Sequence, residues 1–206
     1  ASIIPSSSHH PSHHPIIMKE ILFDNEHRKA HFDFFNNMSN PHFNICANVD
    51  VTDFLAYIKA EGLPTNASIV YLVSRTANEI KEFKRRIRDK NRVVEHETVT
   101  PSFTVFTDVA DVFSFCKVEY EKDAKRFIQR AHETSEEMKR NPSIEDEAGR
   151  DDFLFLSSIP WVSFTSFQHA MNYNNNNDDD DNCWILSFFF FARERVYIYM
   201  RVFARV

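Results

Sequence analysis

The sequence predicts a single α/β domain, and three observations lead to this prediction. The chain has 206 residues, a length that one domain with a sizeable core commonly has. Segments with apolar residues at helical spacing alternate along the chain with short apolar or alternating segments that are typical of strands. The content of 43% apolar and 26% charged residues is ordinary for a globular protein.

The first residues read as a leader rather than as part of the fold. Residues 1–17 are rich in serine, proline and histidine, with paired histidines at positions 9–10 and 13–14. We expect a disordered leader or affinity tag here, followed by a domain over residues 18–206 that begins near Met18. No early apolar run approaches the roughly 18 residues that a membrane span needs, so no membrane partner is expected.

Periodicity and end signals predict the elements of the domain. Helices are expected over residues 24–37, 52–60, 67–83 and 121–140, with Asp24, Thr52 and Asn66 as N-terminal caps and Gly62 ending the second helix. Strands are expected over residues 43–51, 98–107, 112–118, 153–156, 185–191 and 195–206, the second and third forming a hairpin. The basic segment 84–92 is interpreted as a solvated helix end, because it lacks the interleaved aromatics of a nucleic-acid patch.

Composition excludes several classes of function. The net charge of −6 argues against nucleic acid as a partner. The three cysteines are too few and too scattered for a disulfide framework or a zinc site, and no metal is expected. With only two glycines, the chain cannot build a phosphate loop, a dinucleotide fingerprint or a nucleophile elbow. The Asn- and Asp-rich run over residues 172–182 lacks calcium-loop spacing and is interpreted as a solvated turn.

The most informative stretch is Ser157 to Phe167, which reads Ser-Ser-Ile-Pro-Trp-Val-Ser-Phe-Thr-Ser-Phe. It follows the short apolar run 153–156, and Pro160 favours a bend before a second extended segment over residues 161–167. Two hydroxyls, those of Ser157 and Ser158, would lie at the junction. From these residues alone, a β-rich core segment that merely tolerates its serines is favoured over a functional site.

This stretch resembles the central signature of the chloramphenicol acetyltransferase family, Ser-x-x-Pro-Trp-x-Ser-Phe-Thr-Ser-Phe. The segment 28–35, Arg-Lys-Ala-His-Phe-Asp-Phe-Phe, resembles the family's Arg-Lys-x-His-Phe-x-x-Phe helix. Pro101 to Phe106, followed by Phe113-Ser114, resembles its Pro-x-Tyr-Thr-Val-Phe and Thr-Phe-Ser segments. The resemblance covers residues 21–167, with the motifs in the family's order and spacing.

The resemblance implies a fold, a reaction and an assembly. The fold would be a large mixed β-sheet flanked by helices, of the CoA-dependent acyltransferase type. The reaction would transfer acetyl from acetyl-CoA to a hydroxyl of chloramphenicol, an aromatic antibiotic, in the cytoplasm. The enzyme would be a homotrimer that places each site at a subunit interface and takes its general base from the neighbouring chain.

The resemblance also implies roles for individual residues. The Ser157 hydroxyl would donate a hydrogen bond to the oxyanion, and Arg28 would support the loop that carries the base. Phe34, Phe35, Phe103 and Phe113 would form the aromatic slot for the acceptor, with Thr104 as a polar contact.

The chain departs from the family where the base is expected. The family's His-His-x-x-x-Asp-Gly motif is not found, and the last histidine is His169. The histidines at positions 42, 96 and 132 have no motif support as substitutes either, and Glu26 stands where the family has tryptophan. We therefore expect a C-terminus that is truncated or misassigned, with the catalytic histidine beyond Val206.

Three functions remain open from the sequence. The first is an active chloramphenicol O-acetyltransferase. The second is an acetyltransferase of the same fold for a different hydroxylated acceptor. The third is a catalytically inactive homologue or fragment that binds a ligand or partner without turnover.

Overall fold

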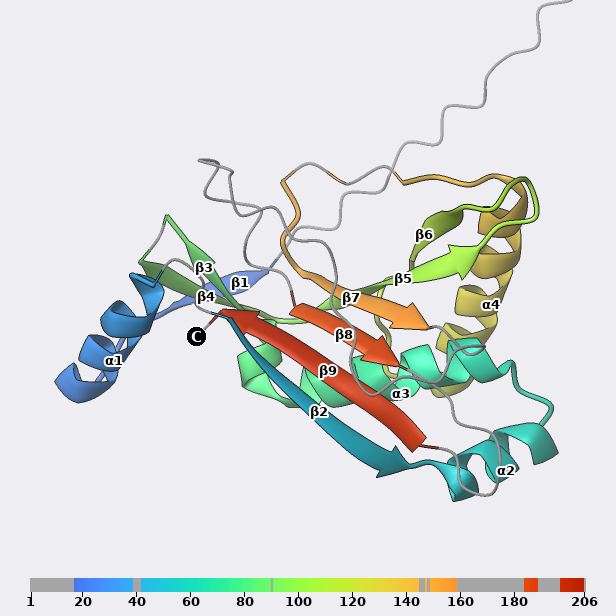
Figure 1. Cartoon of the computed structure of the whole chain (residues 1–206), viewed down its shortest axis with the longest axis horizontal. Coiled ribbons are helices and arrows are strands. Elements are labelled where there is room, and N and C mark those ends of the chain that lie inside the picture. Colours follow the sequence, from blue (N-terminus) through green and yellow to red (C-terminus); the bar gives the residue numbers. More distant parts are fainter. Residues whose placement is uncertain are drawn as a thin grey trace, which may run out of the picture.

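The computed structural model describes residues 17–38, 42–89, 91–144, 147, 149–158, 184–188 and 197–205, and for residues 42–48, 184–188 and 197–205 it describes the backbone alone. A large mixed sheet is flanked by helices (Figure 1). The predicted α/β class is therefore confirmed. The leader over residues 1–16, the bend and extended segment over 159–167 and the turn over 172–182 lie outside the described residues.

The main sheet carries the candidate site. Its strands are β2 (His42–Asp50), β5 (Thr100–Phe106), β6 (Phe113–Lys117), β7 (Phe153–Ser158), β8 (Trp184–Phe188) and β9 (Tyr197–Arg205). In the described ranges they form a six-stranded sheet in the order β2-β9-β8-β7-β5-β6. β7 is parallel to both β5 and β8, and the other neighbours are antiparallel. All the predicted strands are present, with ends shifted by a few residues.

A second, smaller sheet was not predicted. It pairs β1 (Met18–Ile21) and β3 (Arg85–Arg88) with the two edges of β4 (Arg92–His96), all antiparallel. The interpretation of residues 84–92 as a solvated helix end is wrong, because Arg85–Arg88 form β3 and Arg92 begins β4. The short 3-10 helix η1 (Lys81–Lys84) separates them from the preceding α-helix.

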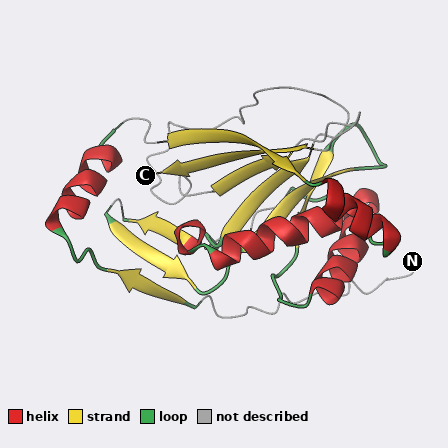
Figure 2. Ribbon diagram, turned by 90° about the horizontal axis from the view of Figure 1, so that it is seen from below, coloured by secondary structure: helices red, strands yellow, loops and turns green. Residues whose placement is uncertain are grey.

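The helices are α1 (Glu26–Asn36), α2 (Thr52–Ala60), α3 (Thr65–Glu79) and α4 (Ala124–Arg140). α3 and α4 cover one face of the main sheet, where their apolar stripes meet the strands (Figure 2). The strand residues of this core are Phe103, Val105, Leu154 and Leu156. None of the helices in the described ranges has the length and apolar character that crossing a bilayer requires.

Helix ends follow the predicted signals only in part. Asn25, not Asp24, caps α1, and its side chain accepts from the backbone N–H groups of His27 and Arg28. α3 begins two residues earlier than expected, with Pro64 at its N-cap, so Asn66 lies inside the first turn. Gly62 adopts a φ of +67°, in agreement with its predicted place just after α2.

Alternation along the strands separates the core face from an open face. Because successive strand residues point to opposite faces, the residues between the core positions face away from α3 and α4. On β5 these are Ser102 and Thr104, and on β7 they are Phe155 and Ser157. The open face therefore carries the hydroxyl that the family resemblance makes catalytic.

Candidate active site

Ser157 and Thr104 come together at the carboxyl ends of two parallel strands. The register pairs Phe103 of β5 with Leu156 of β7, so the next residues, Thr104 and Ser157, are neighbours on the open face. Their hydroxyl oxygens are 3.3 Å apart and form a hydrogen bond. The structure thus brings together two residues that the sequence assigned to the site.

A small recess lies beside these hydroxyls. It has a volume of ≈ 10 Å³, about the space of one water molecule, and reaches from the strand ends to the first turns of α3. Its lining residues are Asn66, Ile69, Val70, Phe103, Thr104, Leu156, Ser157 and Ser158. Asn66 was predicted as a helix cap and instead lies in the first turn of α3, where it lines the recess. Within the described residues, no histidine lines it.

An aromatic row crosses the open face next to the two hydroxyls. The ring centroids of Phe113 and Phe115 are 5.6 Å apart, those of Phe115 and Phe155 are 6.4 Å apart, and those of Phe155 and Phe153 are 6.0 Å apart. Thr104 is the register partner of Phe115, so the row begins beside the hydroxyl pair. Phe113 was predicted as part of an aromatic slot and is 51% exposed here.

Phe115 and Phe155 were not predicted from the sequence. The alternation of strand residues could have indicated them, because Phe115 shares a face with Phe113, and Phe155 shares a face with Ser157. Phe103, which was predicted for the slot, has most of its side chain in the core and is 2% exposed, although it also touches the recess.

The residues predicted on α1 are not near Ser157 in the same chain. α1 has no buried residue, and Phe34 is 65% exposed with its ring in edge contact with Phe35. Figure 1 shows α1 at one end of the molecule and β7 pointing away from it. The Arg28 side chain has no ion-pair partner among the described residues.

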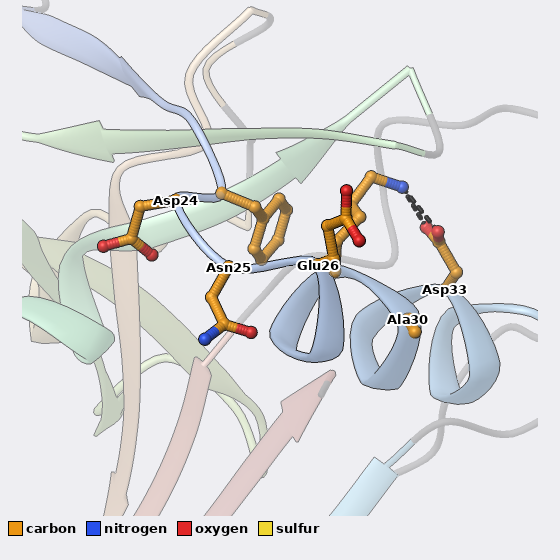
Figure 3. Close-up of a pocket in the computed structure, with 7 residues that line it drawn as sticks. Asp24, Asn25, Glu26, Ala30 and Asp33 are labelled. Atoms are coloured by element: carbon orange, nitrogen blue, oxygen red, sulfur yellow. Dashed lines mark hydrogen bonds and ion pairs between the residues drawn. The ribbon is translucent and has the colours of Figure 1, made fainter.

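A second recess lies at the start of α1 (Figure 3). It is lined by Phe23, Asp24, Asn25, Glu26, Lys29, Ala30 and Asp33, and Lys29 forms an ion pair with Asp33. Nearby, Nδ1 of the His31 ring lies 2.7 Å from the backbone carbonyl oxygen of His27. Across the described residues, no group of three or more His, Cys, Asp or Glu side chains is arranged to hold a metal ion.

A buried arginine ties the start of β7 to the small sheet. The Arg86 guanidinium donates to the carbonyl oxygens of Asp151 at 2.6 Å and Phe153 at 2.9 Å. It also donates to the carbonyl oxygens of Phe83 at 2.9 Å and Arg85 at 2.8 Å. Arg86 therefore helps to set the position of the strand that ends in the Ser157 hydroxyl.

The Asp151 carboxylate strengthens the same junction. Arg88 donates to both of its oxygens at 2.8 and 2.6 Å, and Nε2 of His96 lies 3.0 Å from Oδ1. Burial of Asp151 opposes its ionisation, but the contacts with His96 and Arg88 outweigh burial and hold the pKa of Asp151 well below its usual range. The carboxylate is therefore charged at neutral pH.

The next carboxylate along the chain has its own arginine. Arg150 donates to both oxygens of Asp152 and also reaches Glu119 and the Thr100 hydroxyl. Burial of Asp152 is again outweighed, chiefly by its hydrogen bond with Arg150, and the pKa of Asp152 is lowered. These two ion-paired carboxylates precede β7 and have a structural role in holding it.

Comparison with known proteins agrees with the fold and the motifs. Residues 17–205 match the family described as chloramphenicol acetyltransferase. A chloramphenicol acetyltransferase of Clostridium perfringens is 30% identical over 156 residues, which are 73% of this chain and 70% of that protein. One of Proteus mirabilis is 28% identical over 144 residues, or 70% of this chain and 66% of that protein.

Solved structures give the same result. A chloramphenicol acetyltransferase structure superimposes with a TM-score of 0.72 and 25% identity, covering 92% of this chain and 88% of that one. The dihydrolipoamide acetyltransferase of Azotobacter vinelandii superimposes with a TM-score of 0.59 at 13% identity, covering 87% and 79%, which shows a shared fold alone. The family match over nearly the whole chain, together with this fold, shows that the protein belongs to the chloramphenicol acetyltransferase family of acyltransferases.

Proposed function

We propose that this protein is an O-acetyltransferase that moves the acetyl group of acetyl-CoA to a hydroxyl of chloramphenicol. The observation that carries the proposal is the Ser157 hydroxyl, which lies near the carboxyl end of β7 beside a recess. Among the described residues, its one hydrogen-bond partner is the Thr104 hydroxyl. The family signature gives this serine the role of oxyanion donor. The named relatives support chloramphenicol as the acceptor.

The proposed chemistry needs one donor and one base. The acceptor oxygen attacks the thioester carbonyl while a base removes the acceptor's proton, and the carbonyl oxygen becomes an oxyanion that accepts a hydrogen bond from Ser157. The tetrahedral intermediate then collapses, the C–S bond breaks, and the sulfur takes a proton and leaves as the CoA thiol. The acetyl ester is the second product, and no metal is required.

The base is proposed to come from a neighbouring copy in a homotrimer. His42, which opens β2 soon after α1, pairs with Arg205 at the end of β9, so the last described strand ends on the side of α1. The family places its catalytic histidine after this strand, near the arginine that Arg28 matches. Since β7, which carries Ser157 near its end, points away from α1 in one chain (Figure 1), the α1 region of one copy would meet the Ser157 of another.

The aromatic residues suit a planar acceptor. In this assembly Phe34 and Phe35 of one copy would face the row of Phe113, Phe115 and Phe155 on the next. Offset or edge contacts between such rings and a nitrophenyl group are favourable. We place the reaction in the cytoplasm, where acetyl-CoA is available.

The test is acetyl transfer by the purified full-length protein. Protein, acetyl-CoA and chloramphenicol are incubated together, and the released CoA thiol and the mass of the acceptor are followed in parallel. Acetylated chloramphenicol formed at the rate of thiol release is the expected result, with the same mixture lacking acceptor as the control for thioester hydrolysis.

Other outcomes would contradict the proposal in distinct ways. Acetylation of another hydroxylated compound in a panel, with chloramphenicol untouched, would assign a different acceptor. Binding of chloramphenicol in equilibrium dialysis without any thiol release would show an inactive homologue.

A further inference from the structure

The Ser157 hydroxyl has one hydrogen-bond partner within the described residues, and that partner is the Thr104 hydroxyl at 3.3 Å. The Thr104 hydroxyl in turn has no second partner in the same ranges. Both side chains are half-buried and both line the recess. A pair of hydroxyls isolated in this way has two possible directions of donation, and only one of them leaves Ser157 free to donate to a ligand.

The chemistry selects the direction. A hydroxyl donates one hydrogen bond and accepts two. If Thr104 donates to Ser157 Oγ, the Ser157 proton remains available for an oxyanion, and the bond it receives polarises its own O–H group. If Ser157 donated to Thr104 instead, that bond would have to break before catalysis.

The surroundings of Thr104 hold its hydroxyl in place. Its β-branched side chain has few favourable rotamers in a strand. Its backbone pairs with Phe115 of β6, and the preceding residue, Phe103, pairs with Leu156 of β7. Thr104 is thus a rigid neighbour in contact with a serine near the end of its strand.

We propose that Thr104 is a positioning residue that donates its hydroxyl proton to Ser157 and so directs the Ser157 proton toward the oxyanion. This inference rests on the proposed function. It differs from the role that the family resemblance gives Thr104, which is a direct contact with the acceptor. The two roles predict different kinetics, because a direct contact formed in the ground state changes KM, whereas orientation of the oxyanion donor changes kcat.

The experiment uses four full-length variants beside the wild type: Thr104→Val, Thr104→Ser, Ser157→Ala, and Thr104→Val combined with Ser157→Ala. Valine keeps the shape and β-branching of threonine and removes only the hydroxyl, whereas serine keeps the hydroxyl. Steady-state kcat and KM are measured for chloramphenicol and for acetyl-CoA.

Thr104→Val is expected to lower kcat about three- to tenfold, the effect of one ordinary hydrogen bond, with both KM values changed by less than about twofold. Thr104→Ser is expected to keep kcat within about twofold of the wild type. In the Ser157→Ala background, Thr104→Val is expected to change the residual kcat by less than about twofold, because the group it positions is already absent.

The failures are distinguishable. If the wild type transfers no acetyl to chloramphenicol, the proposed function and this inference fall together. If the wild type is active but Thr104→Val raises the KM for chloramphenicol, or lowers kcat equally with and without Ser157, the inference alone is overturned and Thr104 is a substrate contact.

Discussion

Replacing the buried Arg86 by methionine is expected to destabilise the protein far more than the same change at the exposed Arg92. Arg86 is 2% exposed, and its guanidinium donates to carbonyl oxygens on both sides of the junction between the small sheet and β7. Methionine keeps much of the length of the side chain but donates no hydrogen bond. The two long-range carbonyls, those of Asp151 and Phe153, would lose this charged donor.

The expected magnitude follows from these contacts. Leaving a buried acceptor unsatisfied costs about 1–3 kcal/mol, so two carbonyls give roughly 2–6 kcal/mol. The variant no longer buries a charged guanidinium, which offsets part of this cost, and we expect the free energy of unfolding to fall by about 3 kcal/mol. For a domain of this size, such a loss lowers Tm by roughly 6–12 °C.

The assay is urea unfolding followed by circular dichroism, with thermal melts in parallel. Arg92 is the control, because it lies on the same small sheet, its side chain is 43% exposed, and it forms an ion pair with Asp89 three residues away. Arg92→Met should change the free energy of unfolding by less than about 0.5 kcal/mol. If Arg86→Met costs no more than Arg92→Met, the account of how β7 is anchored is refuted.

Two further stability predictions follow. Asp151→Asn removes the charge that pairs with Arg88 and should cost about 3 kcal/mol at pH 7. The pKa of Asp151 in the folded state is below its ordinary value of about 3.9, so the ionised carboxylate stabilises the fold above about pH 3.9 and loses this effect as pH falls below it. The difference in free energy of unfolding between wild type and variant should therefore narrow from about pH 7 to about pH 3. A gap that stays constant over this range in urea titrations would contradict the assignment. Gly62→Ala should lower the free energy of unfolding by about 1–2 kcal/mol, because alanine is strained at a φ of +67°. An added Cβ would meet no atom within 4 Å, so no steric clash adds to this cost. An unchanged Tm would show that the turn relaxes freely.

Much of the main sheet was predictable because its signals are local. The run Phe-Leu-Phe-Leu at 153–156 and the two segments of the hairpin have the length and composition of strands, and the structure confirms them as β7, β5 and β6. The α/β class follows from the alternation of such segments with amphipathic helices such as α4. These features depend on residues close together in the sequence.

The small sheet was not predictable in the same way. A run of arginines and lysines usually marks a solvated surface, and nothing near Arg86 in the sequence shows that its partners are the carbonyls of Asp151 and Phe153. The pairing of β3 with β4, and of β4 with β1, decides the structure of these residues. Tertiary contacts therefore override the local pattern here.

The candidate site divides along similar lines. Motif resemblance indicated Ser157 and Thr104, and the structure places their hydroxyls in contact. Strand alternation places Phe115 on the face of Phe113 and Phe155 on the face of Ser157, but only the register between β5, β6 and β7 brings them together across the sheet. Arg28, Phe34 and Phe35 keep the roles that the resemblance suggests as proposals, because those roles depend on a second copy of the chain.

The most direct test of the account is the turnover of Ser157→Ala compared with Ser102→Ala. Both changes remove one serine hydroxyl from the open face, and the buried Ser102 hydroxyl has no hydrogen-bond partner within the described residues. The account predicts that Ser157→Ala lowers kcat for acetyl transfer to chloramphenicol by about 10²–10³-fold, as expected for loss of an oxyanion donor, while Ser102→Ala stays within about threefold of the wild type. A loss of less than about tenfold in Ser157→Ala, or equal losses in the two variants, would show that Ser157 is not the oxyanion donor.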